Sequence, residues 1–331
     1  MEEKRWTLMF QIGNVTIENP VIAAPMAGVT DKAYRRILKE YGAGLLYSEM
    51  ISAKGMMHSN KRTFDMIDAS EEERPFVLQL FGSETEDMVK ATRMLSDYKN
   101  IDIVDINMGC PVKKVVKTGA GSRLMMHPDQ AAKIVTAMKK TTDRPVTVKI
   151  RTGWDHDHIN AVSFAKKMEE SGADAIAIHG RTRSQMYGGV ADWDIIRRVK
   201  ETVTVPVIGN GDVFSPEDFI AMLEQTGADG VMIGRGLLGR PWLIRQCMDQ
   251  LERQTHDSVS LDERKTIIKK HMRWLVEDKG EKIATLEMRT HGAWYLKGLP
   301  NASKARRSVS RVRSLDGFMR IIDEYFSSFE G

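Results

Sequence analysis

The chain has 331 residues, of which 42% are hydrophobic, and its formal net charge is +4. This length suits a barrel of roughly 250 residues with a smaller appended unit. The two cysteines, Cys110 and Cys247, lie far apart, which argues against a disulfide framework or a site built from several thiolates. The sequence shows neither a secretory leader nor an apolar run of about 18 residues. We therefore expect a cytoplasmic protein without a membrane span or a metal, and we expect it to be a monomer.

Eight short apolar runs recur along the chain, each followed by turn residues and a longer amphipathic stretch. Runs that are apolar almost throughout are typical of strands buried on both faces, as in a parallel sheet. Eight strand–helix units favour an α/β fold of the (β/α)8 TIM barrel type over an open sheet. The runs are VIAAPM (21–26), LLYSEM (45–50), FVLQLFG (76–82), IVDINMG (103–109), VTVKIR (146–151), AIAIHG (175–180), VPVIGNG (205–211) and VMIGRG (231–236).

The segments at the two ends of the chain have different patterns. Residues 10–20 alternate in polarity around Gly13-Asn14, which predicts a hairpin that closes the bottom of the barrel. After Arg245 the strand signals stop and amphipathic helical patterns follow. The sequence therefore predicts a barrel over residues 1–244 and an all-helical domain over residues 245–331.

Two of the predicted barrel helices carry clear start signals. Ser83 is predicted to cap a helix, with Glu86 placed three residues later. Ser215 is predicted to cap another helix, which has proline at its first position and ends at Gly227. Cys247 lies in a predicted helix and is expected to be a packing residue.

Polar side chains stand at the carboxyl ends of the predicted strands, where barrels of this kind hold their active sites. Lys149 should point inward, and it then meets an anion, forms a Schiff base or makes a structural salt bridge. His179 is either a functional group at the same mouth or a histidine satisfied within the core. The amides of Gln79 and Asn107 lie in apolar strands and require hydrogen-bond partners, which a heteroaromatic ring would supply.

Glycine pairs follow the seventh and eighth predicted strands, in IGNGDV (208–213) and IGRGLL (233–238). Glycines let backbone N–H groups approach an anion closely, and the loops after these two strands often hold phosphate in TIM barrels. The motif of P-loop nucleotide sites is absent from the sequence. These features predict a phosphate site without a P-loop.

A basic segment lies between Arg289 and Arg313, within the predicted helical domain. Its charges belong either to a solvated helical face or to a surface that binds a polyanion. It contains no acidic residue and seven basic ones: Arg289, Lys297, Lys304, Arg306, Arg307, Arg311 and Arg313.

Taken in order, the strand-end segments resemble the tRNA-dihydrouridine synthases over nearly the whole chain, and they are most similar to the bacterial B-type members. No position that is critical for the chemistry departs from the family pattern. The matching segments are APMAGVTD (24–31), LQLFG (78–82), DINMGCP (105–111), GAGSRLM (119–125), VKIRTGWD (148–155), IHGRTRSQMYGGVADW (178–193), IGNGDV (208–213) and IGRGLLGRPW (233–242).

The resemblance implies a barrel that holds FMN and uses NADPH to reduce this flavin. It implies that the enzyme then reduces the C5–C6 double bond of particular uridines in tRNA to 5,6-dihydrouridine. It implies that hydride passes from the flavin to C6 and that Cys110 protonates C5. The cofactor contacts that it implies are Pro25, Met26, Ala27, Gln79, Lys149, His179, Asn210, Gly211, Asp212, Gly234 and Arg235.

Contacts with the substrate are implied at the mouth and in the basic tail. The target base must leave its stack in folded tRNA to enter the pocket, and basic side chains bind the phosphates around it. The implied substrate contacts are Asn107, Lys113, Lys114, Arg181, Arg183, Lys304, Arg306, Arg307 and Arg311.

Three other functions compete with this interpretation. An FMN barrel that acts on a free pyrimidine, like the dihydroorotate dehydrogenases, explains the flavin and the cysteine but not the basic tail. A Schiff-base lyase that uses Lys149 needs no flavin. A non-catalytic RNA-binding barrel would not require Cys110, Lys149 and His179. No motif in the sequence determines which uridines are modified.

Overall fold

Eight parallel strands form the centre of the computed structural model, which describes residues 9–57, 63 and 66–329. The sheet runs in the order β3-β10-β9-β8-β7-β6-β5-β4, and a bridge between Ile22 and Leu45 joins its two edges into a barrel. All eight predicted strands and the barrel fold are confirmed. The strands are β3 (Val21–Ala23), β4 (Leu46–Ser52), β5 (Phe76–Phe81), β6 (Ile103–Asn107), β7 (Val146–Arg151), β8 (Ala175–His179), β9 (Val207–Asn210) and β10 (Gly230–Ile233).

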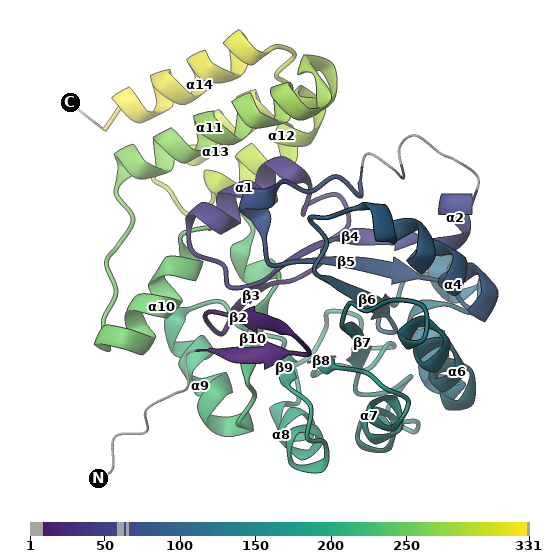
Figure 1. Cartoon of the computed structure of the whole chain (residues 1–331). Helices are drawn as coiled ribbons and strands as arrows, with labels where there is room; N and C mark the ends of the chain where they lie inside the picture. Colours follow the sequence, from purple (N-terminus) through teal and green to yellow (C-terminus); the bar gives the residue numbers. More distant parts are fainter. Residues whose placement is uncertain (1–8, 58–62, 64–65, 330–331) are drawn as a thin grey trace.

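Helices pack around the outside of the barrel and bury the apolar faces of the strands (Figure 1). They are α1 (Lys32–Glu40), α2 (Ala53–Met57), α4 (Thr85–Met94), α6 (Pro128–Lys139), α7 (Ala161–Glu170), α8 (Trp193–Thr202), α9 (Pro216–Thr226) and α10 (Leu243–Arg253). Cys247 of α10 is fully buried in this core, as predicted.

The two predicted helix starts have different outcomes. Ser215 accepts a hydrogen bond from the N–H of Asp218 at the start of α9, and Gly227 ends that helix in a left-handed conformation, as predicted. The prediction for Ser83 is wrong, because α4 has Glu84 at its N-cap position and no side-chain cap. The Ser83 hydroxyl instead donates to the carbonyl oxygen of Thr118, since that loop lies within reach.

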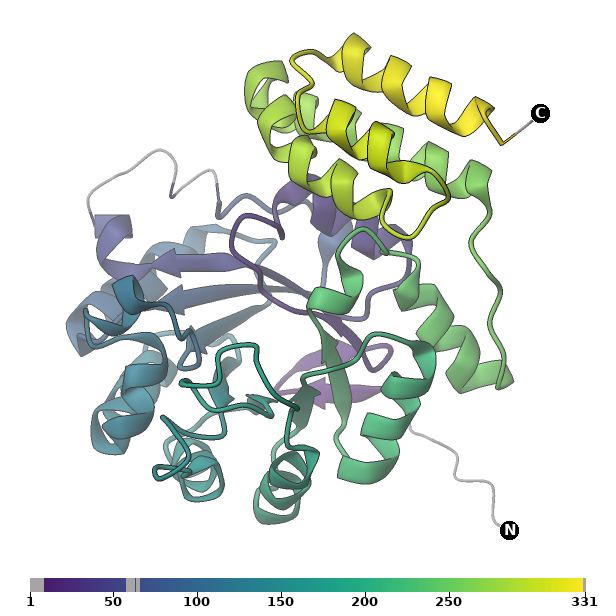
Figure 2. The same cartoon turned by 180° about the vertical axis from the view of Figure 1, so that it is seen from behind.

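The predicted hairpin is present as β1 (Phe10–Ile12) and β2 (Val15–Ile17), and it lies across one end of the barrel (Figure 1). Its residues Ile12 and Ile17 are fully buried in an apolar cluster with side chains from inside the barrel. The hairpin turn approaches the segment just before β7, so it covers the amino-terminal ends of the strands. The carboxyl ends of the strands lie at the opposite end of the barrel, on the side seen in Figure 2.

Four helices follow the barrel and form a second apolar core: α11 (Leu261–Lys279), α12 (Glu281–Tyr295), α13 (Ala302–Val309) and α14 (Leu315–Ser327). The barrel helix α1 contributes Ala33 and Ile37 to this core, so the two parts share a packed junction. The expected boundary after residue 244 falls inside α10, which packs on the barrel. We propose the stretch 254–260, which joins α10 to α11, as the boundary instead.

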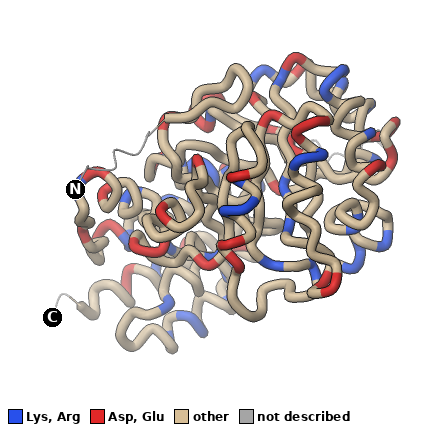
Figure 3. The backbone as a smooth tube through the Cα atoms, turned by 90° about the horizontal axis from the view of Figure 1, so that it is seen from below, with Lys and Arg blue, Asp and Glu red and all other residues tan. Residues whose placement is uncertain are grey.

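Basic and acidic residues are interspersed along the backbone in the view of Figure 3. Across the described residues, no helix is both long enough and apolar enough to cross a membrane. The same residues contain no group of three or more histidine, cysteine, aspartate or glutamate side chains arranged to hold a metal ion.

Candidate active site

A pocket of about 580 Å³ opens at the carboxyl ends of the strands, which is within the range typical of sites for small ligands. The structure brings together there all eleven residues that the sequence predicts to bind a cofactor, along with Cys110 and Asn107. Their convergence follows from the fold, since parallel strands in a barrel end at the same rim. Trp294 of α12 also lines the pocket, so the helical domain contributes to its wall.

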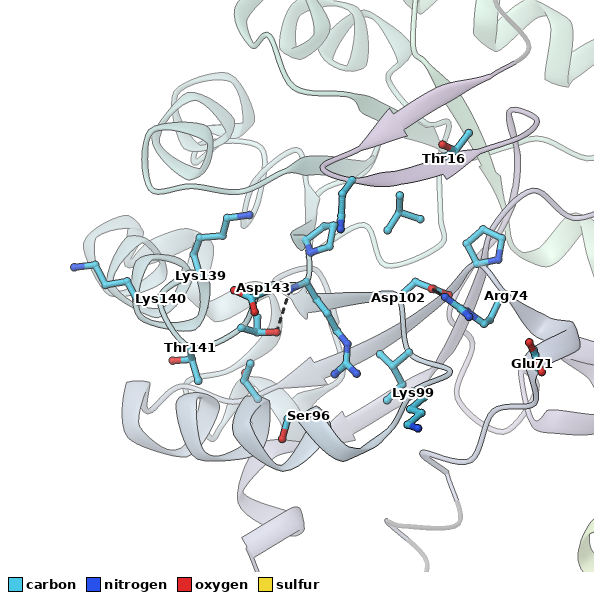
Figure 4. Close-up of a pocket in the computed structure, with 18 residues that line it drawn as sticks. Thr16, Glu71, Arg74, Ser96, Lys99, Asp102, Lys139, Lys140, Thr141 and Asp143 are labelled. Atoms are coloured by element: carbon cyan, nitrogen blue, oxygen red, sulfur yellow. Dashed lines mark hydrogen bonds and ion pairs between the residues drawn. The ribbon is translucent and has the colours of Figure 1, made fainter.

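A larger hollow, of about 1010 Å³, lies at the other end of the barrel, among residues that precede β5, β6 and β7 (Figure 4). Several of its charged groups are already paired. Arg74 binds Asp102, and Arg144 donates to the carbonyl oxygens of Leu95 and Tyr98. These bonds tie loops together beneath the barrel, so we assign this hollow to stability and place the chemistry at the carboxyl-terminal pocket.

Cys110 lies on the loop after β6, and hydrogen bonds hold its backbone from several sides. Its carbonyl oxygen accepts from the N–H of Ser122 at 3.1 Å and from the Ser122 hydroxyl at 3.0 Å. Gly121 has a φ of +62°, and a Cβ there would lie 2.9 Å from the Cys110 carbonyl oxygen. Glycine is therefore required beside the cysteine, which explains part of the glycine-rich turn.

The environment of Cys110 favours the protonated thiol. Burial raises the pKa of this thiol above its ordinary value, although the charges of Arg151 and Lys149 act in the opposite direction. The side chain is only half-buried and lines the pocket. A thiol that stays protonated at neutral pH and faces a pocket can donate a proton to a bound molecule.

Lys149 points from β7 into the pocket, as predicted. Its Nζ donates to Oδ1 of Asn210 at 3.1 Å, and Asn210 in turn donates to the carbonyl oxygen of Met232. Among the described residues, no carboxylate forms a salt bridge with Lys149, so the structural alternative raised by the sequence is not observed. Burial and the neighbouring Arg151 lower the pKa of Lys149 to about 8. The pocket therefore holds a cation at neutral pH without a paired anion.

Arg151 is a pocket residue that the sequence analysis missed. It lies two residues after Lys149 on the same strand and therefore faces the same side, which is the signal that would have identified it. Its Nε donates to the carbonyl oxygen of Gly109 at 2.8 Å, and its Nη1 donates to those of Thr182 and Met186. Arg151 thus links the Cys110 loop to the loop after β8.

His179 ends β8 and is 8% exposed within the pocket wall. Burial, together with the positive charges of Lys149 and Arg151, lowers its pKa far below the ordinary value. The imidazole is therefore neutral at physiological pH. A neutral imidazole can donate a hydrogen bond to a ligand without adding charge.

One end of the pocket suits an anion. Gly211 has a φ of +126°, and a Cβ there would lie 2.7 Å from the Ala191 side chain, so glycine is required. Arg235 follows Gly234 and is exposed, with its guanidinium close to the rings of Tyr187 and Phe214. These backbone groups and the arginine lie where the sequence predicts a phosphate site, and Arg235 also forms a 3.3 Å ion pair with Asp212.

Arg181 does not fit its predicted role as a contact for tRNA phosphates. Its side chain is 2% exposed and forms a 2.7 Å ion pair with Asp212. It also donates to the carbonyl oxygens of Gly188 and Gly189. The guanidinium points inward because Asp212 and the loop after β8 accept its hydrogen bonds. Arg181 therefore holds that loop in place.

The pocket fits a flavin mononucleotide. Its lining includes the ammonium of Lys149, the imidazole of His179 and the apolar side chain of Met26. The expectation that a ring supplies the partners of the Gln79 amide is wrong, because Gln79 is fully buried and bonds to Asp105 and Asn107. Cationic and backbone groups gather at one end, beside Arg235, where a phosphate would lie. A flat ring system with a phosphate tail matches this division into an apolar, polar and cationic surface.

Most of the predicted tRNA contacts lie on the surface. Lys113 and Lys114 are exposed on the short helix α5 (Lys113–Val116), directly after the Cys110 loop. Arg183 is half-buried, with its guanidinium 4.6 Å from the centre of the Trp154 ring. Four others are exposed on α13 or just after it: Lys304, Arg306, Arg307 and Arg311.

Solved structures show the same fold. The structure of histamine dehydrogenase from Rhizobium sp. 4-9 superposes on 82% of the chain with a TM-score of 0.60, at 14% sequence identity. The amine oxidase HisD from Pseudomonas geniculata N1 superposes on 82% with a TM-score of 0.59, at 14% identity. The chain spans about half the length of these proteins, 51% and 53% respectively, so they show the barrel fold alone.

The similarity in sequence extends over nearly the whole chain. Residues 21–329 match the model of the dihydrouridine synthase (Dus) family. The chain is 39% identical over 322 residues to a probable tRNA-dihydrouridine synthase of Rickettsia conorii, with 97% of each chain covered. It is 40% identical over 319 residues to tRNA-dihydrouridine synthase B of Vibrio parahaemolyticus, covering 96% of this chain and 99% of that one. The resemblance seen in the strand-end motifs is thereby confirmed, and the chain belongs to the dihydrouridine synthase family.

Proposed function

We propose that the protein reduces the C5–C6 double bond of uridines in tRNA, with FMN as its cofactor and NADPH as its reductant. The observation that carries this proposal is the position of Cys110, which lines a pocket at the barrel mouth together with the cations of Lys149 and Arg151, and burial raises the pKa of its thiol. Membership of the dihydrouridine synthase family supports the tRNA substrate. When bound, FMN supplies the hydride that adds to C6 of the uracil ring.

Cys110 acts as the general acid in this proposal. Hydride addition at C6 leaves negative charge at C5, and the thiol of Cys110 donates the proton that completes the reduction. Its raised pKa keeps that proton on sulfur until the charge develops. The loop bonds from Arg151 and Ser122 hold the thiol in position.

Other residues of the pocket bind and orient. The ammonium of Lys149 stabilises the anionic form of the cofactor ring, and Arg235 with the backbone at Gly211 and Gly234 binds its phosphate. Asn107 and His179 contact the ring or the uracil. The target uridine leaves its stack to reach the pocket. The surrounding phosphates are bound by basic side chains, namely the half-buried Arg183 and the exposed Lys113, Lys114, Lys304, Arg306, Arg307 and Arg311.

The proposal is tested with purified protein and tRNA from cells that lack this enzyme. We expect the protein to be yellow, and we expect dihydrouridine, measured by mass spectrometry of digested tRNA, to form only with NADPH. In Cys110→Ala, flavin binding and NADPH oxidation should persist, whereas dihydrouridine formation should fall by about a hundredfold or more, the usual contribution of a general acid.

Cys247→Ala is the matched control, because Cys247 is buried in the core away from the pocket and its removal should leave the rate unchanged. A colourless protein would contradict the flavin assignment. Full activity of Cys110→Ala would remove the general-acid role.

A further inference from the structure

A buried chain of polar side chains begins at Asp105 on β6, beneath the floor of the pocket. Asp105 is fully buried. One carboxylate oxygen accepts from the Thr147 hydroxyl at 2.6 Å, and the other accepts from Nε2 of Gln79 at 2.8 Å. The three residues lie on adjacent strands at paired positions, Gln79 with Asp105 and Asp105 with Thr147. The strand register therefore places the carboxylate between its two donors.

The chain continues from Gln79 to the loop that carries the thiol. Oε1 of Gln79 accepts from Nδ2 of Asn107 at 2.8 Å. Oδ1 of Asn107 then accepts from the backbone N–H groups of Gly109, at 3.2 Å, and Cys110, at 2.8 Å. Both amides in this series of hydrogen bonds therefore donate through their NH2 group and accept through their oxygen.

An amide side chain has one donor end and one acceptor end, so its orientation follows from its neighbours. A carboxylate only accepts hydrogen bonds, so Gln79 must direct its NH2 group toward Asp105 and its oxygen toward Asn107. Asn107 must then direct its own NH2 group to Gln79 and its oxygen to the loop. Reversal of the first link would place an NH2 group against the two backbone N–H groups, leaving buried donors unpaired.

We propose that Asp105 is a positioning residue for Cys110, which it holds by orienting the amides of Gln79 and Asn107. The proposal rests on the proposed function, in which Cys110 is the general acid. Asp105 touches neither the thiol nor the pocket and acts only through the two amides.

The carboxylate is ionised at neutral pH, as this role requires. Burial raises the pKa of Asp105 to about 6, and the bonds from Thr147 and Gln79 with the charge of Lys149 keep it from rising further. Tyr47 of β4 is the remaining titratable neighbour, and its phenol stays protonated because its own pKa is raised by burial. No other described group competes with Gln79 for the second carboxylate oxygen.

The test uses the full-length protein and two substitutions that exchange the carboxylate and the amide. Asp105→Asn removes the constraint, because an amide at 105 can turn either its oxygen or its NH2 group to Gln79 while the Thr147 hydroxyl pairs with the other end. It should therefore speed hydrogen exchange of the Gly109 and Cys110 amides roughly tenfold or more. The turnover number for uridine reduction should fall, while the KM for tRNA stays the same. Adding Asn107→Asp supplies an acceptor for Gln79 and for the loop, so the double variant should restore protection of both amides.

Thr147→Ser is the control variant, because it changes the same neighbour of Asp105 but keeps the hydroxyl that donates to the carboxylate, so the order of donors and acceptors is unchanged. Its loop amides should exchange as in the wild type. Unchanged exchange in Asp105→Asn, or equal acceleration in Thr147→Ser, would overturn the proposal. If Asp105→Asn alone does not fold, the test relies on the double variant. Its hydrogen-bond donors and acceptors are paired again, so it should fold and protect the loop amides. Failure of the double variant to do so contradicts the proposal.

The exchange measurement separates this proposal from the proposed function. If the wild-type protein forms no dihydrouridine, the proposed function fails, but altered exchange in Asp105→Asn still supports the orienting chain. If the wild type is active and exchange does not respond to Asp105→Asn, only the role of Asp105 fails.

Discussion

At the scale of single residues, the pocket depends on charges that lack an opposite partner. Lys149 donates to the neutral Asn210, and Arg151 bonds only to carbonyl oxygens. Burial, with the nearby charge of Arg151 as a second cause, disfavours the charged form of Lys149 and lowers its pKa. A bound anion would stabilise the ammonium, which is why we assign Lys149 to cofactor binding.

The pH dependence of the reaction should report on Lys149. Its pKa of about 8 means that the ammonium is charged below that pH and is lost as the pH rises above it. Because a bound anionic cofactor raises this pKa further, we expect the reduction rate to fall as the pH increases beyond about 8. In Lys149→Gln the rate should be low throughout, and this decline should be absent.

Lys166→Gln provides a matched control for the loss of a lysine. Lys166 lies on the outer helix α7 and pairs with Glu169, away from the pocket. Its variant should retain the wild-type pH profile and flavin spectrum. An unchanged profile and an unchanged flavin spectrum in Lys149→Gln would contradict the assignment of Lys149.

At the scale of an element, α13 shows how a short helix can present charge. It buries Ala302, Ala305 and Val309 against the other helices, and these small apolar residues bring its backbone close to them. The basic side chains of Arg306 and Arg307 are consequently left on the exposed side. This arrangement favours the polyanion-binding interpretation of the tail, since acidic partners for these side chains are absent among the described residues.

Charge reversal at Arg306, Arg307 and Arg311 should weaken tRNA binding and leave NADPH oxidation unchanged. Each lost phosphate contact should reduce the slope of log affinity against log salt concentration by about one. Binding titrations at several salt concentrations measure this slope.

A triple variant with glutamate at Lys90, Lys133 and Lys140 changes the net charge equally. These lysines are exposed on or beside the outer barrel helices α4 and α6. If both triple variants bind tRNA equally well, the tail is only a solvated face.

At the scale of the whole molecule, a buried polar junction joins the barrel to the helical domain. Asp31, at the N-cap of α1, accepts a hydrogen bond from Lys279 of α11 at 3.0 Å. Beside it, Tyr34 stacks on His271 with ring centres 5.3 Å apart, and His291 lies 4.6 Å from His271. Because Trp294 on the same helix as His291 lines the pocket, this junction determines how the helical domain meets the site.

Acid should weaken this junction. Burial lowers the pKa of His291 to about 4, so between about pH 6.5 and pH 4 the unfolded chain binds a proton that the folded protein does not. The free energy of unfolding must therefore decrease as the pH falls through this window, by about 3 kcal/mol at pH 4. Urea unfolding between pH 4 and pH 8 measures this change.

His291→Gln should reduce the acid sensitivity of unfolding, and the neighbouring His271 should account for much of the remainder, since its pKa is also lowered by burial. His156→Gln is the matched control, because His156 is 97% exposed and its loss should leave the pH dependence intact. Equal pH dependence in the wild type and in His291→Gln would show that His291 does not contribute to the acid sensitivity.

The sequence by itself determined the eight strands, the hairpin and the residues at the strand ends. Buried parallel strands require continuous apolar runs, and strand ends in a barrel converge on one rim, so linear order predicts the site at Cys110 and Lys149. Only the tertiary structure decided that Arg181 turns inward to Asp212 and that Asp105 lies beneath the pocket. Those outcomes depend on which distant group arrives beside each side chain, and hydrogen bonds between distant residues leave no periodic trace in the sequence.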